Sequence, residues 1–229
     1  MSQSDYPMWI NGGEVRSERV VEVRVPYDGG PFATVYSAGE EHLKQAVEAA
    51  VAAGPVMRAM TLDARAAILR RASARLLAEK EEFATIISSE SGKPIKEGRV
   101  EAERAASTLL FSAEEARRLR GEVVPMEALE AGKGRMAMTV REPVGVIAAI
   151  TPFNFPLNLS MHKIGPALAG GNTVVHKPAS VTPVSALRLA RLFSECGLPD
   201  GALNVVTGPG GQVGDFLVEH SAVRMITFT

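Results

Sequence analysis

The sequence has very little cysteine and almost no excess of charge of either sign. Cys196 is the single cysteine in 229 residues, which excludes an internal disulfide framework and favours a reducing compartment. The formal net charge of -1 gives no indication of a nucleic-acid partner or of a basic membrane-docking surface. The four histidines, His42, His162, His176 and His220, lack the spacing of metal ligands. These features predict a globular cytoplasmic protein with no metal site.

A long hydrophobic run is also missing. The most apolar stretch, residues 144–159, is interrupted by Pro152, Asn154 and Pro156 and is too short to span a bilayer. Residues 1–9 contain an aspartate and no apolar core of the length found in signal peptides. We therefore expect neither a membrane span nor a secretory leader.

The first 120 residues change from extended to helical patterns. Residues 9–13 carry a turn signal, and residues 20–25 alternate apolar and charged side chains like a half-buried strand. Helical spacing follows over residues 40–53, from the N-cap Thr61 to residue 87, and over residues 95–119. Gly92 and Pro94 mark a helix end before the last of these. The mixed charges of that last helix fit a solvated face better than a binding site.

The remaining residues divide into a hairpin and an alternating α/β segment. Residues 121–142 predict a β-hairpin with a long connection. Strand patterns over residues 144–150, 172–176, 203–206 and 223–228 then alternate with helical patterns over residues 157–168, 182–196 and 212–219. This alternation predicts an α/β fold with a Rossmann-like parallel sheet and flanking helices. We expect three parts: an N-terminal strand and helical part (residues 1–120), the hairpin (121–142) and a Rossmann-like part (143–229).

Ligands of such sheets lie beyond the carboxyl ends of the strands. The candidate segments are therefore residues 151–154, 177–180 and 208–211. Asn154, held between two prolines, can donate to a developing oxyanion or satisfy backbone groups of its own loop. Lys177 can reach ribose hydroxyls or a phosphate, or it can be a solvated lysine. Ser180 can bind the same ribose, cap a helix, or do both.

Two other features carry weaker signals. Gly208 and Gly210 fit the first two positions of the phosphate-loop pattern G-x-G-x-x-G, whereas Val213 occupies the third. Cys196 ends an amphipathic helix with no sequence sign of an activating base, so we expect a small buried thiol.

Several ordered motifs resemble the aldehyde dehydrogenase superfamily. They are Ile150-Thr151-Pro152-Phe153-Asn154-Phe155-Pro156, residues 165–175 (GPALAGGNTVV), Lys177-Pro178-Ala179-Ser180, residues 197–199 with 203–206, and the closing residues 226–229, together with Ile10-Asn11-Gly12 near the start. Residues 208–220 also resemble, more weakly, the non-phosphorylating glyceraldehyde-3-phosphate and lactaldehyde dehydrogenase branches. The resemblance extends over nearly the whole chain.

The resemblance implies that residues 1–120 and 143–229 belong to a cofactor-binding domain, of which 143–229 is an incomplete Rossmann-like part, and that the catalytic domain is absent. It also implies specific site residues and partners. Asn154 matches the oxyanion-hole asparagine of the family. The implied contacts to NADP or NAD are Ile150, Thr151, Pro152, Phe153, Lys177, Pro178, Ser180, Gly210 and Gly214. An aldehyde is the implied substrate, and the hairpin resembles a flap through which family members form homo-oligomers.

The implied reaction begins when a cysteine thiolate attacks the aldehyde, and it ends when a glutamate activates water to release the acid. The resemblance places both residues after Thr229, so we expect the isolated chain to be inactive. Ser180 stands where many NAD-using members have glutamate, which predicts that NADP is accepted. Two readings follow: the N-terminal portion of an aldehyde dehydrogenase, or a non-catalytic cofactor-fold or assembly module.

Overall fold

A computed structural model describes residues 4–229, and its N-terminal strands divide between two sheets. Strand β1 (Ser4–Tyr6) joins β5 (Pro31–Tyr36) and β4 (Val20–Arg24) in a small sheet of order β1-β5-β4. Strands β2 (Met8–Ile10) and β3 (Gly13–Val15) are linked by the predicted turn, in which Asn11 and Gly12 have positive φ angles of 52° and 76°. This turn lets β2 and β3 pair as a hairpin.

The main sheet confirms the predicted parallel arrangement. Its order is β11-β8-β9-β10-β2-β3, formed by β11 (Val223–Phe228), β8 (Val146–Ile150), β9 (Thr173–Lys177), β10 (Leu203–Val205) and the N-terminal hairpin. The first four strands are parallel, whereas β2 pairs antiparallel with β10. Ile150 is opposite Lys177, and His176 is opposite Val205, so three strands end at one edge.

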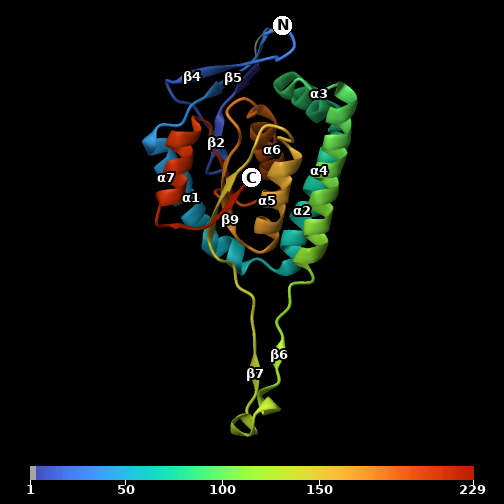
Figure 1. The fold of residues 1–229 in the computed structure, drawn as a ribbon, viewed down its shortest axis with the longest axis vertical. Coiled ribbons are helices and arrows are strands. Elements are labelled where there is room, and N and C mark those ends of the chain that lie inside the picture. The colour runs from blue at the N-terminus through green and yellow to red at the C-terminus, as the bar shows by residue number, and fades with distance from the viewer. Residues whose placement is uncertain (1–3) are drawn as a thin grey trace.

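Helices cover both faces of this sheet (Figure 1). Alternate residues of β8 point to opposite faces, and Val146 and Ala148 pack in one cluster with α1 (Glu40–Ala59) and α7 (Asp215–Glu219). Ile147 and Ala149 pack in the other cluster with α5 (Asn158–Ala169) and α6 (Val184–Glu195). Because both of its faces are covered, β8 is apolar along its whole length, as the sequence predicted.

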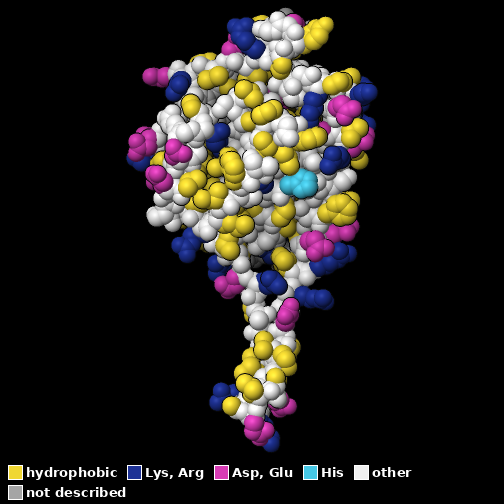
Figure 2. All heavy atoms as spheres, in the orientation of Figure 1, with side chains coloured by type: hydrophobic (Ala, Val, Ile, Leu, Met, Phe, Trp, Pro, Cys, Tyr) yellow, Lys and Arg dark blue, Asp and Glu magenta, His cyan; other side chains and the backbone are white. Residues whose placement is uncertain are grey.

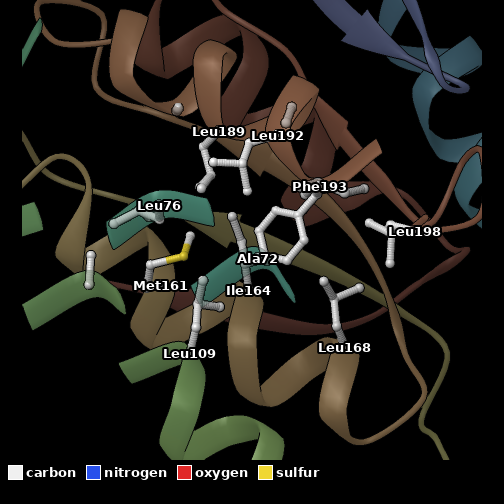
Figure 3. Packing of buried hydrophobic residues seen from close by; sticks show 14 of the residues in the cluster. Ala72, Leu76, Leu109, Met161, Ile164, Leu168, Leu189, Leu192, Phe193 and Leu198 are labelled. Carbon is white, nitrogen blue, oxygen red and sulfur yellow. The ribbon is translucent and has the colours of Figure 1, made fainter. Parts of the chain in front are cut away.

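A second helical layer lies outside α5 and α6. It consists of α2 (Leu62–Ala78), α3 (Lys80–Ser91) and α4 (Ile95–Ala116). Thr61 caps α2 as predicted, by accepting the Ala64 N–H at 3.1 Å, and Gly92 ends α3 with a φ of 74°. Figure 3 shows Leu109 of α4 and Leu76 of α2 against side chains of α5 and α6.

Several predicted helix boundaries are wrong, two of them because of packing. The helix expected from Thr61 to residue 87 is broken at Glu79, which lies between α2 and α3. Helix α1, expected to end at residue 53, continues through Pro55 to Ala59 because its last turns bury Met57 in the core. In both places tertiary packing sets the boundary rather than the local turn residues.

The predicted hairpin projects far from the body of the molecule (Figure 1). Strands β6 (Val123–Val124) and β7 (Ala137–Met138) pair antiparallel, and short 3-10 turns at Met126–Ala128 and Glu130–Gly132 form its tip. Hydrophobic side chains lie along its length (Figure 2); among them are Val123, Leu129, Met136 and Val140, which are between 73% and 84% exposed. In the described part of the chain, none of the helices has the length and apolar character needed to cross a membrane.

Candidate functional site

Three loops meet at the carboxyl edge of the main sheet. The loop after β8 begins at Thr151, the loop after β9 at Pro178, and the loop after β10 at Val206. The Ser180 hydroxyl donates to the Gly208 carbonyl at 2.8 Å, which ties the second loop to the third. The structure therefore brings the three predicted candidate segments to one edge of the sheet.

The first loop presents Asn154 to solvent. Ile150 and Pro152 are half-buried and Thr151 is buried, whereas Phe153 and Asn154 are exposed. Among residues 4–229 the Asn154 side chain has no hydrogen-bond partner, so it does not satisfy the backbone of its own loop. Its amide is free to meet a ligand at this edge.

A buried carboxylate from α4 holds the end of this loop. Glu101 is 2% exposed, and its Oε1 accepts the N–H groups of Leu157 at 3.0 Å and Asn158 at 3.2 Å. Its other oxygen pairs with the Lys93 ammonium at 2.7 Å. That ammonium also lies 3.8 Å from the centre of the Phe155 ring. The expectation of a solvated charged face on α4 is therefore wrong at Glu101.

The second loop begins with a buried cation. Lys177 is 5% exposed, so the alternative of a solvated lysine is wrong. Its ammonium donates to the Pro178 carbonyl at 3.0 Å, and burial lowers its pKa. No carboxylate of the described residues pairs with it. A buried ammonium with a single carbonyl partner can accommodate ribose hydroxyls or a phosphate.

A second buried glutamate, Glu90, holds the end of this loop as Glu101 holds the end of the first. Glu90 is buried in α3, and its carboxylate accepts the N–H groups of Val184 at 2.7 Å and Ser185 at 3.2 Å, at the start of α6. Burial raises the pKa of Glu90 to about 8, although these hydrogen bonds act in the opposite direction. The N-termini of α5 and α6 are thus both capped by acids from the outer helical layer.

A buried polar cluster lies directly beneath the two loops. The Nε2 atom of His176 is 3.0 Å from the Thr151 hydroxyl and 3.3 Å from the Ser160 hydroxyl. His176 is fully buried, and desolvation, with a smaller contribution from Lys177 and Lys163, lowers its pKa to about 3. The imidazole is therefore neutral and links β9 to the start of the first loop.

The third loop leaves open space beside Ser180. The residues that line a cavity of about 270 Å³ include Ser180, Thr207, Gly208 and Pro209, together with Val35 and Tyr36 of β5. Gly208 has a φ of 151°, which disfavours any other residue there. Gly210 is exposed and Gly214 is buried, and a Cβ added at either would meet nothing within 4 Å. Pro178 is buried and fixes the turn that precedes Ser180.

Cys196 is the C-cap residue of α6, at the opposite end of that helix from its start after the second loop. It is 5% exposed, which confirms the prediction of a buried thiol. Burial raises the pKa of the thiol, so the thiolate is disfavoured.

The sequence reasoning missed Glu101, Glu90, Lys93 and His176. A signal for the two acids was present, because each occupies the apolar stripe of its helix. Glu90 is three residues after Ile87, and Glu101 is four residues before Ala105, both of which are buried. An acid at such a position indicates a buried carboxylate that must find donors.

Three features define an α/β domain that can hold a dinucleotide. They are open loops at the carboxyl ends of parallel strands, a helix start beside each loop, and a buried lysine that forms no ion pair within residues 4–229. A profile of the aldehyde dehydrogenase family matches residues 10–229. The chain belongs to the aldehyde dehydrogenase family.

Individual relatives show the same relationship. The 3-sulfolactaldehyde dehydrogenase of Priestia aryabhattai is 47% identical over 224 residues, which are 98% of this chain and 46% of that protein. Aspartate-semialdehyde dehydrogenase 1 of Pseudomonas canavaninivorans is 41% identical over 209 residues, covering 91% of this chain and 44% of that protein. The chain thus spans about half the length of the curated relatives that it matches.

The fold matches solved structures equally well. The NADP-dependent glyceraldehyde-3-phosphate dehydrogenase of Bacillus halodurans C-125, solved with NADP, superimposes with a TM-score of 0.96 at 34% identity. That match covers 99% of this chain and 48% of the other. The predicted superfamily and fold class are confirmed.

Proposed function

We propose that the protein carrying this chain oxidises a small aldehyde to the carboxylic acid and that NAD or NADP accepts the hydride. The observation that carries this proposal is the exposed amide of Asn154, which has no hydrogen-bond partner among residues 4–229 and lies on the loop after β8, the strand that ends opposite Lys177. There Asn154 would donate to the oxyanion that forms when a nucleophile adds to the carbonyl carbon.

Lys177, Ser180 and the exposed Gly210 would hold the cofactor. The Lys177 ammonium would bind ribose hydroxyls, and the cavity beside Ser180 leaves space next to that ribose. A serine does not repel a 2′-phosphate, whereas a carboxylate at this position would. We therefore propose that NADP is accepted, alone or together with NAD.

We infer that Cys196 is not the nucleophile. Its thiol is buried and has a raised pKa, whereas a catalytic cysteine must reach substrate as a thiolate. The nucleophile and the base would come from segments that the family resemblance places after Thr229. The isolated chain should then bind cofactor fragments but leave aldehydes unoxidised.

We further propose that the aldehyde carries a negatively charged group. Arg104 of α4 is exposed, with its guanidinium carbon 5.8 Å from the centre of the Phe155 ring, next to Asn154. No carboxylate of residues 4–229 forms an ion pair with Arg104, so its charge can meet that of a ligand. The three relatives named above support this class, since their names specify aldehydes with a sulfonate, a carboxylate and a phosphate.

A pair of matched aldehydes tests the function and the substrate class together. Succinate semialdehyde and butanal have the same chain length and differ in charge, and oxidation is followed by the absorbance of the reduced cofactor. In the complete enzyme, Arg104→Gln should lower kcat/KM for succinate semialdehyde by roughly 10- to 100-fold, the effect of one charged hydrogen bond. Butanal turnover should change little.

Arg99→Gln is the matched control, because Arg99 lies on the same helix but pairs with Glu81 in solvent. If neither aldehyde is oxidised with either cofactor, the proposed function is wrong. If Arg104→Gln affects both aldehydes equally, the function stands and the proposed anionic class is wrong.

We also propose that the hairpin of β6 and β7 mediates a homo-oligomer. Its exposed apolar side chains, Val123 and Met136 among them, form an extended surface that water solvates poorly. Replacing both residues by aspartate should reduce the sedimentation coefficient of the complete protein while the circular dichroism spectrum stays unchanged. An unaltered coefficient would place the interface elsewhere.

A further inference from the structure

The backbone that carries Asn154 is held at its far end by a side chain from another helix. Helix α5 begins directly after the loop, and no side chain of its own caps it, since Leu157 occupies the N-cap position. Glu101 of α4 supplies the missing acceptor for both Leu157 and Asn158. The first N–H groups of a helix carry partial positive charge, so a carboxylate binds them more strongly than a neutral oxygen does.

The same carboxylate acts on the residue that follows Asn154. Its second oxygen holds Lys93, and the Lys93 ammonium faces the ring of Phe155. Glu101 therefore fixes Leu157 directly and Phe155 through Lys93, on either side of Pro156. The other end of the loop is fixed where Thr151 donates its N–H to the Lys177 carbonyl at 3.2 Å.

Asn154 itself has no such anchor. Because its side chain has no hydrogen-bond partner among the described residues, its direction depends on how firmly the loop backbone is held. An oxyanion donor must be held close to its productive position, since a displacement of about 1 Å can cost roughly a hundredfold in rate.

We propose that Glu101 is a positioning residue for the reaction: through the amides of Leu157 and Asn158 and through Lys93, it holds the loop so that Asn154 points at the reacting carbonyl. This role rests on the proposed oxyanion function of Asn154. It differs from a contribution to stability alone, because its effect on kcat requires the side chain of Asn154.

A double-mutant cycle in the complete enzyme distinguishes positioning from stability. Glu101→Gln keeps the size of the side chain and one acceptor oxygen but loses the charge that binds the two amides and Lys93. We expect kcat to fall about tenfold, with little change in the KM for NAD or NADP. In the Asn154→Ala background the same substitution should leave kcat nearly unchanged, because the donor that it positions is gone. The shift in melting temperature should be equal in both backgrounds.

Glu103→Gln is the matched control, since Glu103 lies two residues further along α4 and pairs with Lys80 at the surface. Lys93→Met is a milder change, because the Glu101 carboxylate still accepts the N–H groups of Leu157 and Asn158. This variant tests the positioning role if Glu101→Gln does not fold. It should lower kcat in the native background and not in Asn154→Ala.

The inference is overturned if either variant lowers kcat by the same factor in both backgrounds, or lowers the melting temperature while kcat holds. A native kcat for Asn154→Ala alone would instead contradict the oxyanion assignment, and the positioning role would fall with it.

Discussion

Two buried ionisable side chains, Glu90 and His176, should give the protein a plateau of stability in mildly acidic solution. Burial raises the pKa of Glu90 from 4.5 to about 8, so the folded state holds this proton more tightly than the unfolded state does. Its stabilising contribution is complete below pH 4.5 and is lost as the pH rises towards 8. Burial lowers the pKa of His176 from 6.5 to about 3, so its contribution is complete above pH 6.5 and is lost as the pH falls towards 3.

Between pH 4.5 and 6.5 the two effects oppose each other. Each gives a slope of about 1.4 kcal/mol per pH unit in the free energy of unfolding, and the slopes have opposite signs. Their sum is therefore close to zero, although each alone would change stability by about 3 kcal/mol over this interval. Above pH 6.5 the Glu90 contribution continues to fall, while that of His176 is constant.

Single substitutions should reveal the pH dependence of the free energy of unfolding that each group contributes. In His176→Gln, the free energy of unfolding should fall by about 3 kcal/mol from pH 4.5 to 6.5, because Glu90 acts alone. In Glu90→Gln it should rise by the same amount. Urea unfolding followed by circular dichroism at several pH values measures both, and His162→Gln, at an exposed position of α5, is the control. A plateau that survives either substitution would refute this account of the two buried groups.

Three further outcomes can be checked with the same variants and assays. Ser180→Glu in the complete enzyme should reduce kcat/KM for NADP roughly tenfold or more relative to NAD, because a carboxylate repels a 2′-phosphate; equal losses would show that other contacts discriminate. Cys196→Ala should leave kcat unchanged, and a loss of turnover in a folded variant would make Cys196 functional. Leu109→Ala, which empties a fully buried position of α4, should lower the free energy of unfolding by about 2–5 kcal/mol in urea titrations, whereas a loss below about 1 kcal/mol would mean that the core repacks there.

Local sequence patterns predicted the parallel part of the main sheet because its strands alternate with helical spacing, and they predicted β8 because it is a short apolar run followed by turn residues. The apolar run Val144–Ile150 indicates a buried strand, and Gly170-Gly171 indicates a turn. Each signal is contained within a few neighbouring residues. The break at Glu79 has no such local signal. There Glu79 pairs with Arg188 of α6 and with Arg75, and the former contact joins segments far apart in the chain.

The grouping of the candidate site residues was also predictable from sequence. Residues at the carboxyl ends of parallel strands share an edge by topology alone, so Asn154, Lys177 and Ser180 could be grouped without a structure. The partners that hold them could not be grouped in this way. Glu101 contacts Leu157 across 56 residues, and no periodicity in either segment specifies that pairing.

The most direct test of the central claim is the kinetic effect of Asn154→Ala in the complete enzyme, with an aldehyde that carries a carboxylate as substrate. Removal of one oxyanion donor should lower kcat about a hundredfold, or roughly 3 kcal/mol of transition-state stabilisation. The dissociation constant for NADP, measured by fluorescence titration, should stay the same. If kcat holds and cofactor affinity falls, Asn154 is a binding residue and the strand edge does not supply an oxyanion site.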